Sequence, residues 1–80
     1  MPKVYKVLSG DEVVKILLGH GFYFKTQKGS HMKVYFAGPN MNGAVIVPRM
    51  KELRQGTLKS VIDQAAIYVN EKDLEKDFKN

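Results

Sequence analysis

The sequence predicts an α+β fold in which two amphipathic helices cover one face of a three-stranded antiparallel sheet. Apolar residues recur at helical spacing after Ser9 and again after Thr57. Between these regions, two segments alternate polar and apolar residues as strands do, and clusters of turn-forming residues separate them. Because the apolar side of a helix and of a sheet must each be buried, we expect these elements to pack as two layers.

The first helix is expected to run from about Gly10 to His20. A capping-box pattern precedes it, in which the Ser9 side chain accepts a hydrogen bond from the backbone three residues on and Glu12 bonds back. The apolar stripe consists of Val13, Ile16, Leu17 and His20. Gly21 can end the helix in the left-handed conformation. His20 is expected to pack or cap there, because an imidazole gains from the negative end of the helix dipole.

Residues 22–27 and 31–36 are expected to form two strands joined by a tight turn at Lys28-Gly29-Ser30, where Gly29 can adopt a positive φ. Alternate side chains of a strand share a face. The apolar set comprises Phe22, Phe24, Met32, Val34 and Phe36, and the opposite set comprises Tyr23, Lys25, Gln27, His31, Lys33 and Tyr35. Since the apolar set supplies the core, we expect the second set on an open face that stays in water.

Residues 37–43 are dense in turn formers and are expected to form a loop. A third strand follows over residues 44–47 and ends at Pro48, but its periodicity does not decide which side chains point inward. A basic connection over residues 49–56 leads to the second helix, for which Thr57 is the expected N-cap.

The second helix has an apolar face made of Leu58, Val61, Ile62, Ala65 and Ala66. Asn70 is expected to cap a short final helix in which Leu74 and Phe78 lie one turn apart. Among these and the strand residues, we expect the core to include Phe22, Phe24, Phe36, Leu58 and Ile62.

The composition fits one small domain over residues 1–80. The chain has no cysteine, which excludes disulfides and thiolate metal sites, and its two histidines do not form a ligand set. We therefore expect no metal and no small-molecule cofactor. No apolar run approaches the roughly 20 residues that cross a bilayer, and the start of the chain lacks the apolar stretch of a signal peptide. These features favour a cytoplasmic protein without membrane contact.

The chain carries a net charge of +5 with a pI near 9.6, and its charges are unevenly distributed. Between residues 25 and 59 only Glu52 opposes the basic residues Lys25, Lys28, Lys33, Arg49, Lys51, Arg54 and Lys59. The tail is acidic instead, with Glu71, Asp73, Glu75 and Asp77. This distribution favours binding of a polyanion by the middle of the chain. The alternative is a solvated surface that happens to be basic.

His31 is the best candidate for chemistry, because it stands at the start of a strand beside the turn Lys28-Gly29-Ser30. Histidine exchanges protons near neutral pH, and a glycine lets a ligand's backbone come close. Gly29 and Ser30 serve the turn, which is compatible with phosphate contact. A further anion site is expected at the start of the second helix, surrounded by Lys51, Arg54 and Lys59. The alternative for His31 is a surface histidine beside a turn.

Three segments, in order over residues 9–67, resemble the HicA-type toxins of bacterial toxin–antitoxin modules, also called YcfA-like proteins. They are residues 9–24, the turn Gln27-Lys28-Gly29-Ser30-His31, and Val47-Pro48 followed by residues 51–58. The resemblance implies a double-stranded-RNA-binding-domain-like fold, which agrees with the element order above. It also implies a stress-response toxin that cleaves mRNA, with His31 as the catalytic residue, and a HicB-type antitoxin that covers the site.

For such an endoribonuclease we expect neutral His31 to take the proton of a ribose 2′-hydroxyl, which then attacks the adjacent phosphate. Lys28 or Lys33 would stabilise the negative charge on phosphorus, and water or a lysine would protonate the leaving oxygen. The expected RNA contacts are Lys25, Lys28, Gly29, Ser30, Lys33, Lys51, Arg54 and Lys59.

The chain departs from the family pattern where a second histidine often precedes Lys51, because it has Arg49-Met50 there. His20 also stands where the family usually has a different polar residue. Two alternatives remain open at this point. One is a non-catalytic module that binds double-stranded RNA by shape. The other is a relic that binds an antitoxin but has lost its activity.

Overall fold

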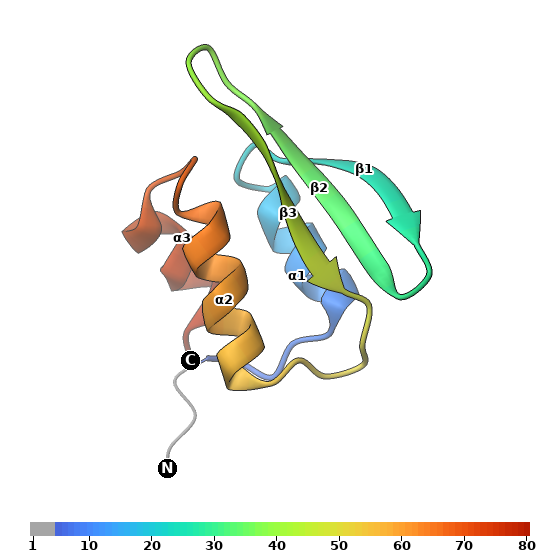
Figure 1. Ribbon diagram of the computed structural model, residues 1–80. Helices are drawn as coiled ribbons and strands as arrows, with labels where there is room; N and C mark the ends of the chain where they lie inside the picture. Colours follow the sequence, from blue (N-terminus) through green and yellow to red (C-terminus); the bar gives the residue numbers. More distant parts are fainter. Residues whose placement is uncertain (1–4) are drawn as a thin grey trace.

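A helix, three strands and two further helices follow one another along residues 5–80, the part of the chain that the structure, a computed structural model, describes. In chain order they are α1 (Gly10–Leu18), β1 (Tyr23–Lys28), β2 (His31–Ala37), β3 (Asn42–Pro48), α2 (Gln55–Ala65) and α3 (Glu71–Phe78) (Figure 1). The predicted α+β class and element order are confirmed. The expectation of no signal peptide rests largely on residues 1–4, which lie outside the described part.

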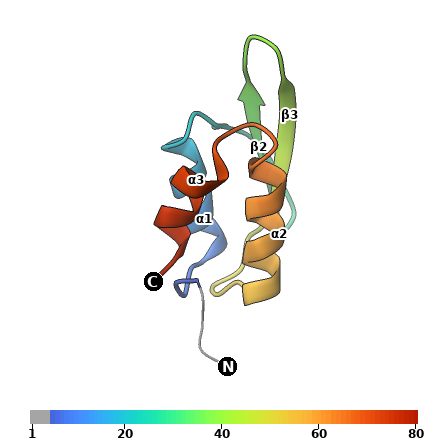
Figure 2. The ribbon, with the colours of Figure 1, turned by 90° about the vertical axis from the view of Figure 1, so that its left-hand side faces the viewer.

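The three strands form one antiparallel sheet in the order β1-β2-β3, so that β1 and β3 are its edges. Helix α1 packs against all three strands, whereas α2 packs against β3 and α3. Figure 2 shows α1 and α3 together on one side of the sheet, with α2 beside β3. The opposite side of the sheet carries exposed side chains such as His31 and Ile46.

The core lies between α1, the inner face of the sheet and the two later helices. In β2, Met32 and Val34 are only 3% and 0% exposed, as the alternation predicts. In β3, whose inward side the sequence left open, Val45 and Val47 are fully buried and Ile46 points outward. The helices contribute Val13, Val14, Leu17, Leu58, Val61, Ile62, Ala65, Leu74 and Phe78. Full burial of one such large side chain stabilises the fold by about 1.5–3 kcal/mol.

Helix α1 begins as predicted but ends earlier. Ser9 Oγ accepts a hydrogen bond from Glu12 N at 3.1 Å, and Glu12 Oε1 accepts one from Ser9 N at 2.9 Å, which completes the capping box. The bond from the Ser9 backbone N–H also lowers the pKa of the Glu12 carboxyl. The helix ends at Leu18 rather than at His20, because the chain turns through Gly19 and through Gly21, which has φ +96°.

Helix α2 begins at Gln55 with Arg54 as its N-cap, so the prediction that Thr57 is the N-cap is wrong. The physical reason is a tether to the N-terminal segment. Gln55 Oε1 accepts a hydrogen bond from Tyr5 N at 2.9 Å, and Gln55 Nε2 donates one to Tyr5 O at 3.2 Å. This pair of bonds fixes the start of the helix, and Thr57 lies within its first turn.

Helix α3 follows the prediction. Asn70 Oδ1 accepts a hydrogen bond from Asp73 N at 3.2 Å and thereby caps the helix. Leu74 and Phe78 are both fully buried. Two strands, however, are longer than predicted: β2 continues to Ala37 and β3 starts at Asn42, which shortens the loop between them, whereas β1 is shifted by one residue at the predicted length.

Two expectations about β1 are wrong, and a β-bulge explains one of them. The register pairs Phe24 with Val34 but Thr26 with Lys33, so the chain slips by one residue between them. Gln27 therefore pairs with Met32 and lies on the inner face, not on the open one. Phe24 is 47% exposed rather than buried, because it lies in an edge strand that is exposed along its length.

The other predicted aromatic core residues are at least partly buried. Phe22 is 3% exposed, and Phe36 is partly buried against the core. The Phe36 ring stacks on Tyr68, with centroids 5.6 Å apart, and meets Phe22 at 5.3 Å.

Candidate nucleic-acid interface

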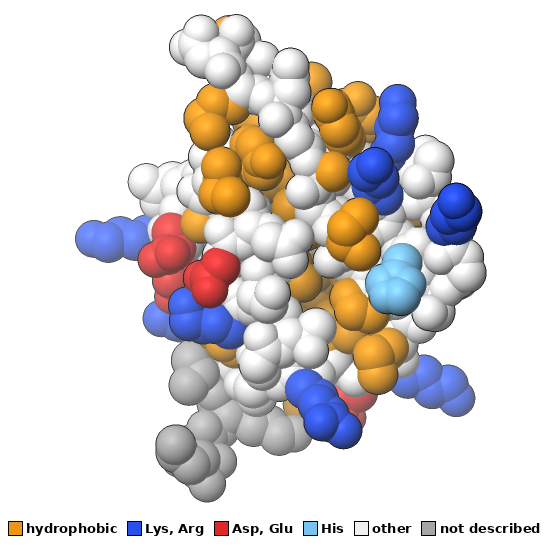
Figure 3. All heavy atoms as spheres, viewed as in Figure 1, with side chains coloured by type: hydrophobic (Ala, Val, Ile, Leu, Met, Phe, Trp, Pro, Cys, Tyr) orange, Lys and Arg blue, Asp and Glu red, His pale blue; other side chains and the backbone are white. Residues whose placement is uncertain are grey.

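The uncovered side of the sheet, called here the open face, is organised in three rows that run across the strands. The strand register and the bulge give the rows Tyr23–Tyr35–Ala44, then Lys25 and Thr26 with Lys33–Ile46, then Lys28–His31–Pro48. Lys25 lies at the bulge, and its Nζ is 5.9 Å from the centroid of the Tyr35 ring. The rows therefore combine lysines, aromatic rings and one imidazole. Figure 3 shows this mixture of basic, apolar and histidine side chains.

The bulge has a direct consequence for the candidate site. Without this one-residue slip, strict alternation along β1 would place Lys28 on the inner face, away from His31. With it, Lys28 pairs directly with His31 across the strands, and Thr26 pairs with Lys33. The expected association of His31 with lysines is therefore tighter in the structure than the alternation alone predicts.

The turn between β1 and β2 fixes this pair. Only Gly29 and Ser30 separate Lys28 from His31, and Gly29 has φ +60° whereas Ser30 has no positive φ. A glycine with positive φ at the first central position is typical of the two-residue hairpin turn called type II′. A Cβ built on Gly29 would meet no atom within 4 Å, so the glycine is needed for its φ and not for space.

Gln27 and Arg49 hold the turn from its inner side, and the sequence did not predict this role for them. Gln27 Nε2 donates a hydrogen bond to Gly29 O at 3.2 Å, and Arg49 Nη1 donates one to Gln27 Oε1 at 3.1 Å. The backbone N–H of Arg49 donates to Ser30 O. Arg49 Nε also lies 3.4 Å from the Asp11 carboxylate. Arg49 thus supports the turn that carries His31.

The open face carries positive charge that no acid offsets. The sequence contains no Asp or Glu between Val13 and Lys51, which includes the whole sheet. Among the ion pairs within residues 5–80, none involves Lys25, Lys28 or Lys33. Within the described residues, the exposed His31 ring makes no hydrogen bond to another side chain or to the backbone. Both the imidazole and the lysines are therefore available to an anionic ligand.

The remaining predicted contact residues lie apart from this group. Lys51 and Arg54 are exposed in the connection before α2, and Lys59 lies on α2, next to β3. Lys59 Nζ is 2.9 Å from Asp63 Oδ1, and this carboxylate raises the pKa of Lys59. No side chain caps the start of α2. The structure brings Lys25, Lys28, Gly29, Ser30, Lys33 and His31 together. It places Lys51 and Arg54 in the connection after β3, and Lys59 on α2, where Asp63 and Glu71 are near.

His20 does not belong to the open face. Its Nε2 lies 2.6 Å from Asp77 Oδ2, and the imidazole is 19% exposed. This contact ties the turn after α1 to α3 and agrees with the expectation that His20 packs. The acidic partner lies 57 residues further along the chain, which is why local spacing did not indicate it.

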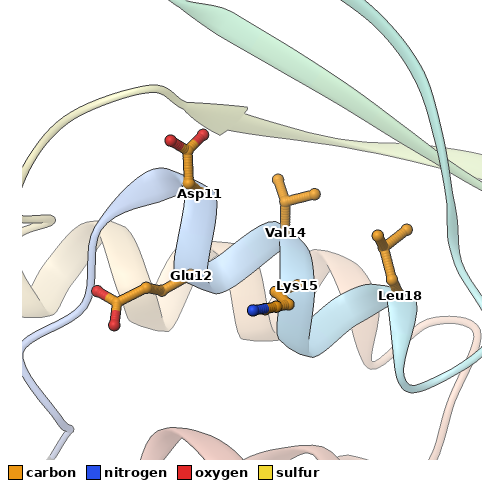
Figure 4. Close-up of a pocket in the computed structure, with 5 residues that line it drawn as sticks. All are labelled: Asp11, Glu12, Val14, Lys15 and Leu18. Carbon is orange, nitrogen blue, oxygen red and sulfur yellow. The ribbon is translucent and has the colours of Figure 1, made fainter.

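One hollow of the described surface lies away from the open face, along α1. Asp11, Glu12, Val14, Lys15 and Leu18 line a shallow depression of about 340 Å³ (Figure 4). Its Glu12 carboxylate is already engaged by the capping box.

Within residues 5–80 no three potential ligand side chains gather as a metal site would need. None of the helices in that range is long and apolar enough to cross a membrane.

Comparison with known proteins identifies a family for this chain. The model of the HicA toxin family, described as a HicA toxin of bacterial toxin–antitoxin systems, matches residues 10–67. The match includes α1, the whole sheet and α2. Among curated proteins, none gives a significant match. Because the family match covers well over half of the chain, the protein belongs to the HicA family of toxins from bacterial toxin–antitoxin systems.

Proposed function

We propose that this toxin is an endoribonuclease that cleaves mRNA with His31 as its general base. The observation that carries the proposal is the exposed His31 side chain, held opposite Lys28 by a tight turn on a face without carboxylates. General-base catalysis needs an accessible group of this kind, and phosphoryl chemistry needs cations where negative charge develops. The open face supplies both.

In the proposed reaction, neutral His31 accepts the proton of a ribose 2′-hydroxyl. The 2′-oxygen attacks the adjacent phosphorus, and the bond to the 5′-oxygen of the next nucleotide breaks. That oxygen takes a proton from water or from a lysine. The products are therefore a 2′,3′-cyclic phosphate and a free 5′-hydroxyl. Lys28 and Lys33 flank His31 on the open face and stabilise the additional negative charge on the phosphate.

RNA binding in this proposal is electrostatic and uses the open face first. Lys25, Lys28 and Lys33 contact phosphates, and Gly29 and Ser30 let the backbone of the RNA approach the turn. Lys51 and Arg54 extend the basic surface into the connection after β3, and Lys59 adds a charge on α2 that Asp63 partly offsets. Binding through phosphates releases counterions, so the affinity should fall as the salt concentration rises.

Membership of the HicA family implies an antitoxin partner. We propose that the partner is a HicB-type antitoxin that covers the open face and thereby blocks access to His31. The proposed location of both proteins is the bacterial cytoplasm, where mRNA is found. Acidic side chains on the antitoxin would match a sheet that carries only lysines and histidine as charged groups.

The test compares RNA decay with the wild-type protein and with His31→Ala, after thermal unfolding has shown that both are folded. His20→Ala serves as the matched control, because it removes the other histidine from a site away from the open face. The proposal predicts that His31→Ala loses cleavage and that His20→Ala keeps it, with some loss of stability. A protein that binds RNA in a salt-sensitive way but cleaves none in either form would instead be a non-catalytic RNA-binding module.

A further inference from the structure

We infer that Tyr23 and Tyr35 form a stacking platform for unpaired bases, so that the open face takes single-stranded rather than duplex RNA. This inference deepens the proposed function and rests on it. Strand alternation already indicated that both tyrosines share a face with His31, but it gave them no role. The structure adds the contacts between them and their surroundings.

The two rings lie side by side on neighbouring strands. Tyr23 pairs directly with Tyr35, and their ring centroids are 5.8 Å apart with planes inclined at 53°. Tyr23 is 44% exposed, and Tyr35 is partly exposed. On the other side of Tyr35, β3 contributes only the methyl group of Ala44. The small neighbour leaves room over the sheet beside the Tyr35 ring, where a base could lie.

Cations surround this pair. Lys25 Nζ is 5.9 Å from the Tyr35 ring centroid, close enough for a cation–π contact, and Lys33 occupies the next position of β2 on the same face. Proteins that bind single strands of any sequence combine aromatic rings, on which bases stack, with cations that contact the phosphate backbone. The sheet carries no carboxylate, so no acidic side chain on it repels the phosphates of RNA.

The distance between Tyr35 and His31 indicates which nucleotide could stack on the platform. Tyr35 and His31 are four positions apart on β2 and share a face, which corresponds to about 13 Å along the strand. Successive bases of a helical strand rise by about 3.4 Å, and those of an extended strand are further apart. A base stacked on Tyr35 would therefore belong to a nucleotide a few positions away from the cleaved bond.

Stacking of this kind requires an unpaired base. In duplex RNA the faces of the bases are covered by their neighbours, and proteins contact mainly phosphates and 2′-hydroxyls. Exposed tyrosine rings contribute little to such contacts. In a single strand, each base can leave its stack and lie against a ring. The Tyr23–Tyr35 pair consequently distinguishes the two forms of RNA, whereas the lysines alone do not.

The experiment measures binding in the His31→Ala background, so that it does not depend on cleavage. Because the chain has no tryptophan, its fluorescence comes from its four tyrosines, and comparison with Tyr35→Phe identifies the part of the quenching that is due to Tyr35. A short single-stranded RNA is titrated, and then the same sequence as a duplex. The variants are Tyr35→Ala and Tyr35→Phe, and Phe24→Ala is the matched control because it removes an exposed ring from the inner face of β1. Circular dichroism confirms that each variant is folded.

Tyr35→Ala should weaken single-strand binding by about 5- to 150-fold, the effect expected for one lost base–aromatic stack, and leave duplex binding unchanged. Tyr35→Phe should keep the affinity and lose part of the quenching, and Phe24→Ala should change neither. Equal affinity of Tyr35→Ala and its parent for the single strand would overturn the inference. So would an equal loss for both forms of RNA, or a Tyr35→Ala variant that is impaired only in binding a HicB-type antitoxin. If Tyr35→Ala weakens single-strand binding as expected but His31→Ala still cleaves RNA at the wild-type rate, only the proposed catalytic mechanism is refuted.

Discussion

Replacing Gly29 by alanine tests whether the β1–β2 turn holds His31 opposite Lys28. Gly29 has φ +60°, a conformation that costs an L-residue roughly 1–2 kcal/mol. No atom lies within 4 Å of a Cβ built there, so a steric clash adds nothing. The lower entropy of the unfolded chain offsets about 0.4–1 kcal/mol of the cost. The expected result is a net destabilisation of about 1 kcal/mol.

The matched control is Gly56→Ala in the first turn of α2. A Cβ at Gly56 also meets no atom within 4 Å, but this glycine has no positive φ. The substitution should therefore stabilise the protein, by up to about 1 kcal/mol. Thermal unfolding followed by circular dichroism separates the two, because 1 kcal/mol corresponds to about 4–8 °C in the melting temperature of a domain of this size. If Gly29→Ala melts at or above the wild-type temperature, the proposed turn geometry is wrong.

The same variant links the turn to activity. At a temperature where it is fully folded, Gly29→Ala should cleave RNA more slowly than wild type, because the changed turn displaces His31 relative to Lys28. Gly29→Asn should recover part of that rate, since asparagine tolerates a positive φ more readily than alanine. Equal rates for all folded Gly29 variants would show that the turn does not position the imidazole.

Three further predictions concern packing, pH and charge. Gly43→Ala should lose about 1–3 kcal/mol in urea unfolding, because a Cβ there overlaps the Tyr68 ring and overpacking has that cost; an unchanged midpoint would contradict the contact. The Glu12 pKa is lowered, so its contribution to stability is present above the ordinary value of 4.5 and is lost as the pH falls through the lowered one. Glu12→Gln should therefore lose less stability on acidification than wild type, as urea unfolding across that range will show; equal acid sensitivity would count against the capping bond. Lys33→Ala should reduce the slope of log affinity against log salt by about 0.7 for single-stranded RNA, measured by titration, and an unaltered slope would remove Lys33 from the phosphate contacts.

Local chemistry made most of the helices and their ends predictable. Ser9 and Glu12 form a capping box from residues three positions apart, and Asn70 caps α3 in the same local way. The start of α2 was missed because it depends on Gln55 and Tyr5, which lie 50 positions apart. Thr57 has good capping chemistry, but a tertiary tether sets the helix boundary instead.

The candidate site was predictable where it depends on strand alternation. His31 and Lys33 lie on the open face because Met32 and Val34 are buried. The β1 bulge was not predictable, because no glycine or proline marks it within the strand. That single slip moved Gln27 inward.

Other parts of the site depend on contacts across the fold. The support of the turn by Arg49 requires β3 to end beside it, and Arg49 N–H bonds to Ser30 O there. The stacking of Tyr23 with Tyr35 likewise requires the strand register. Spacing along the sequence can suggest which residues share a face, but only the register shows which of them touch.

The central claim is that His31 activates a ribose 2′-hydroxyl for attack on the neighbouring phosphate. The most direct measurement is the single-turnover cleavage rate of one RNA oligonucleotide and of its counterpart with a 2′-deoxyribose at the cleaved position. Wild-type protein should cleave only the first, leave a 2′,3′-cyclic phosphate, and lose about 10²- to 10⁴-fold in rate on His31→Ala substitution. Cleavage of the deoxy substrate at the same rate, or a His31→Ala protein as fast as wild type, would contradict it.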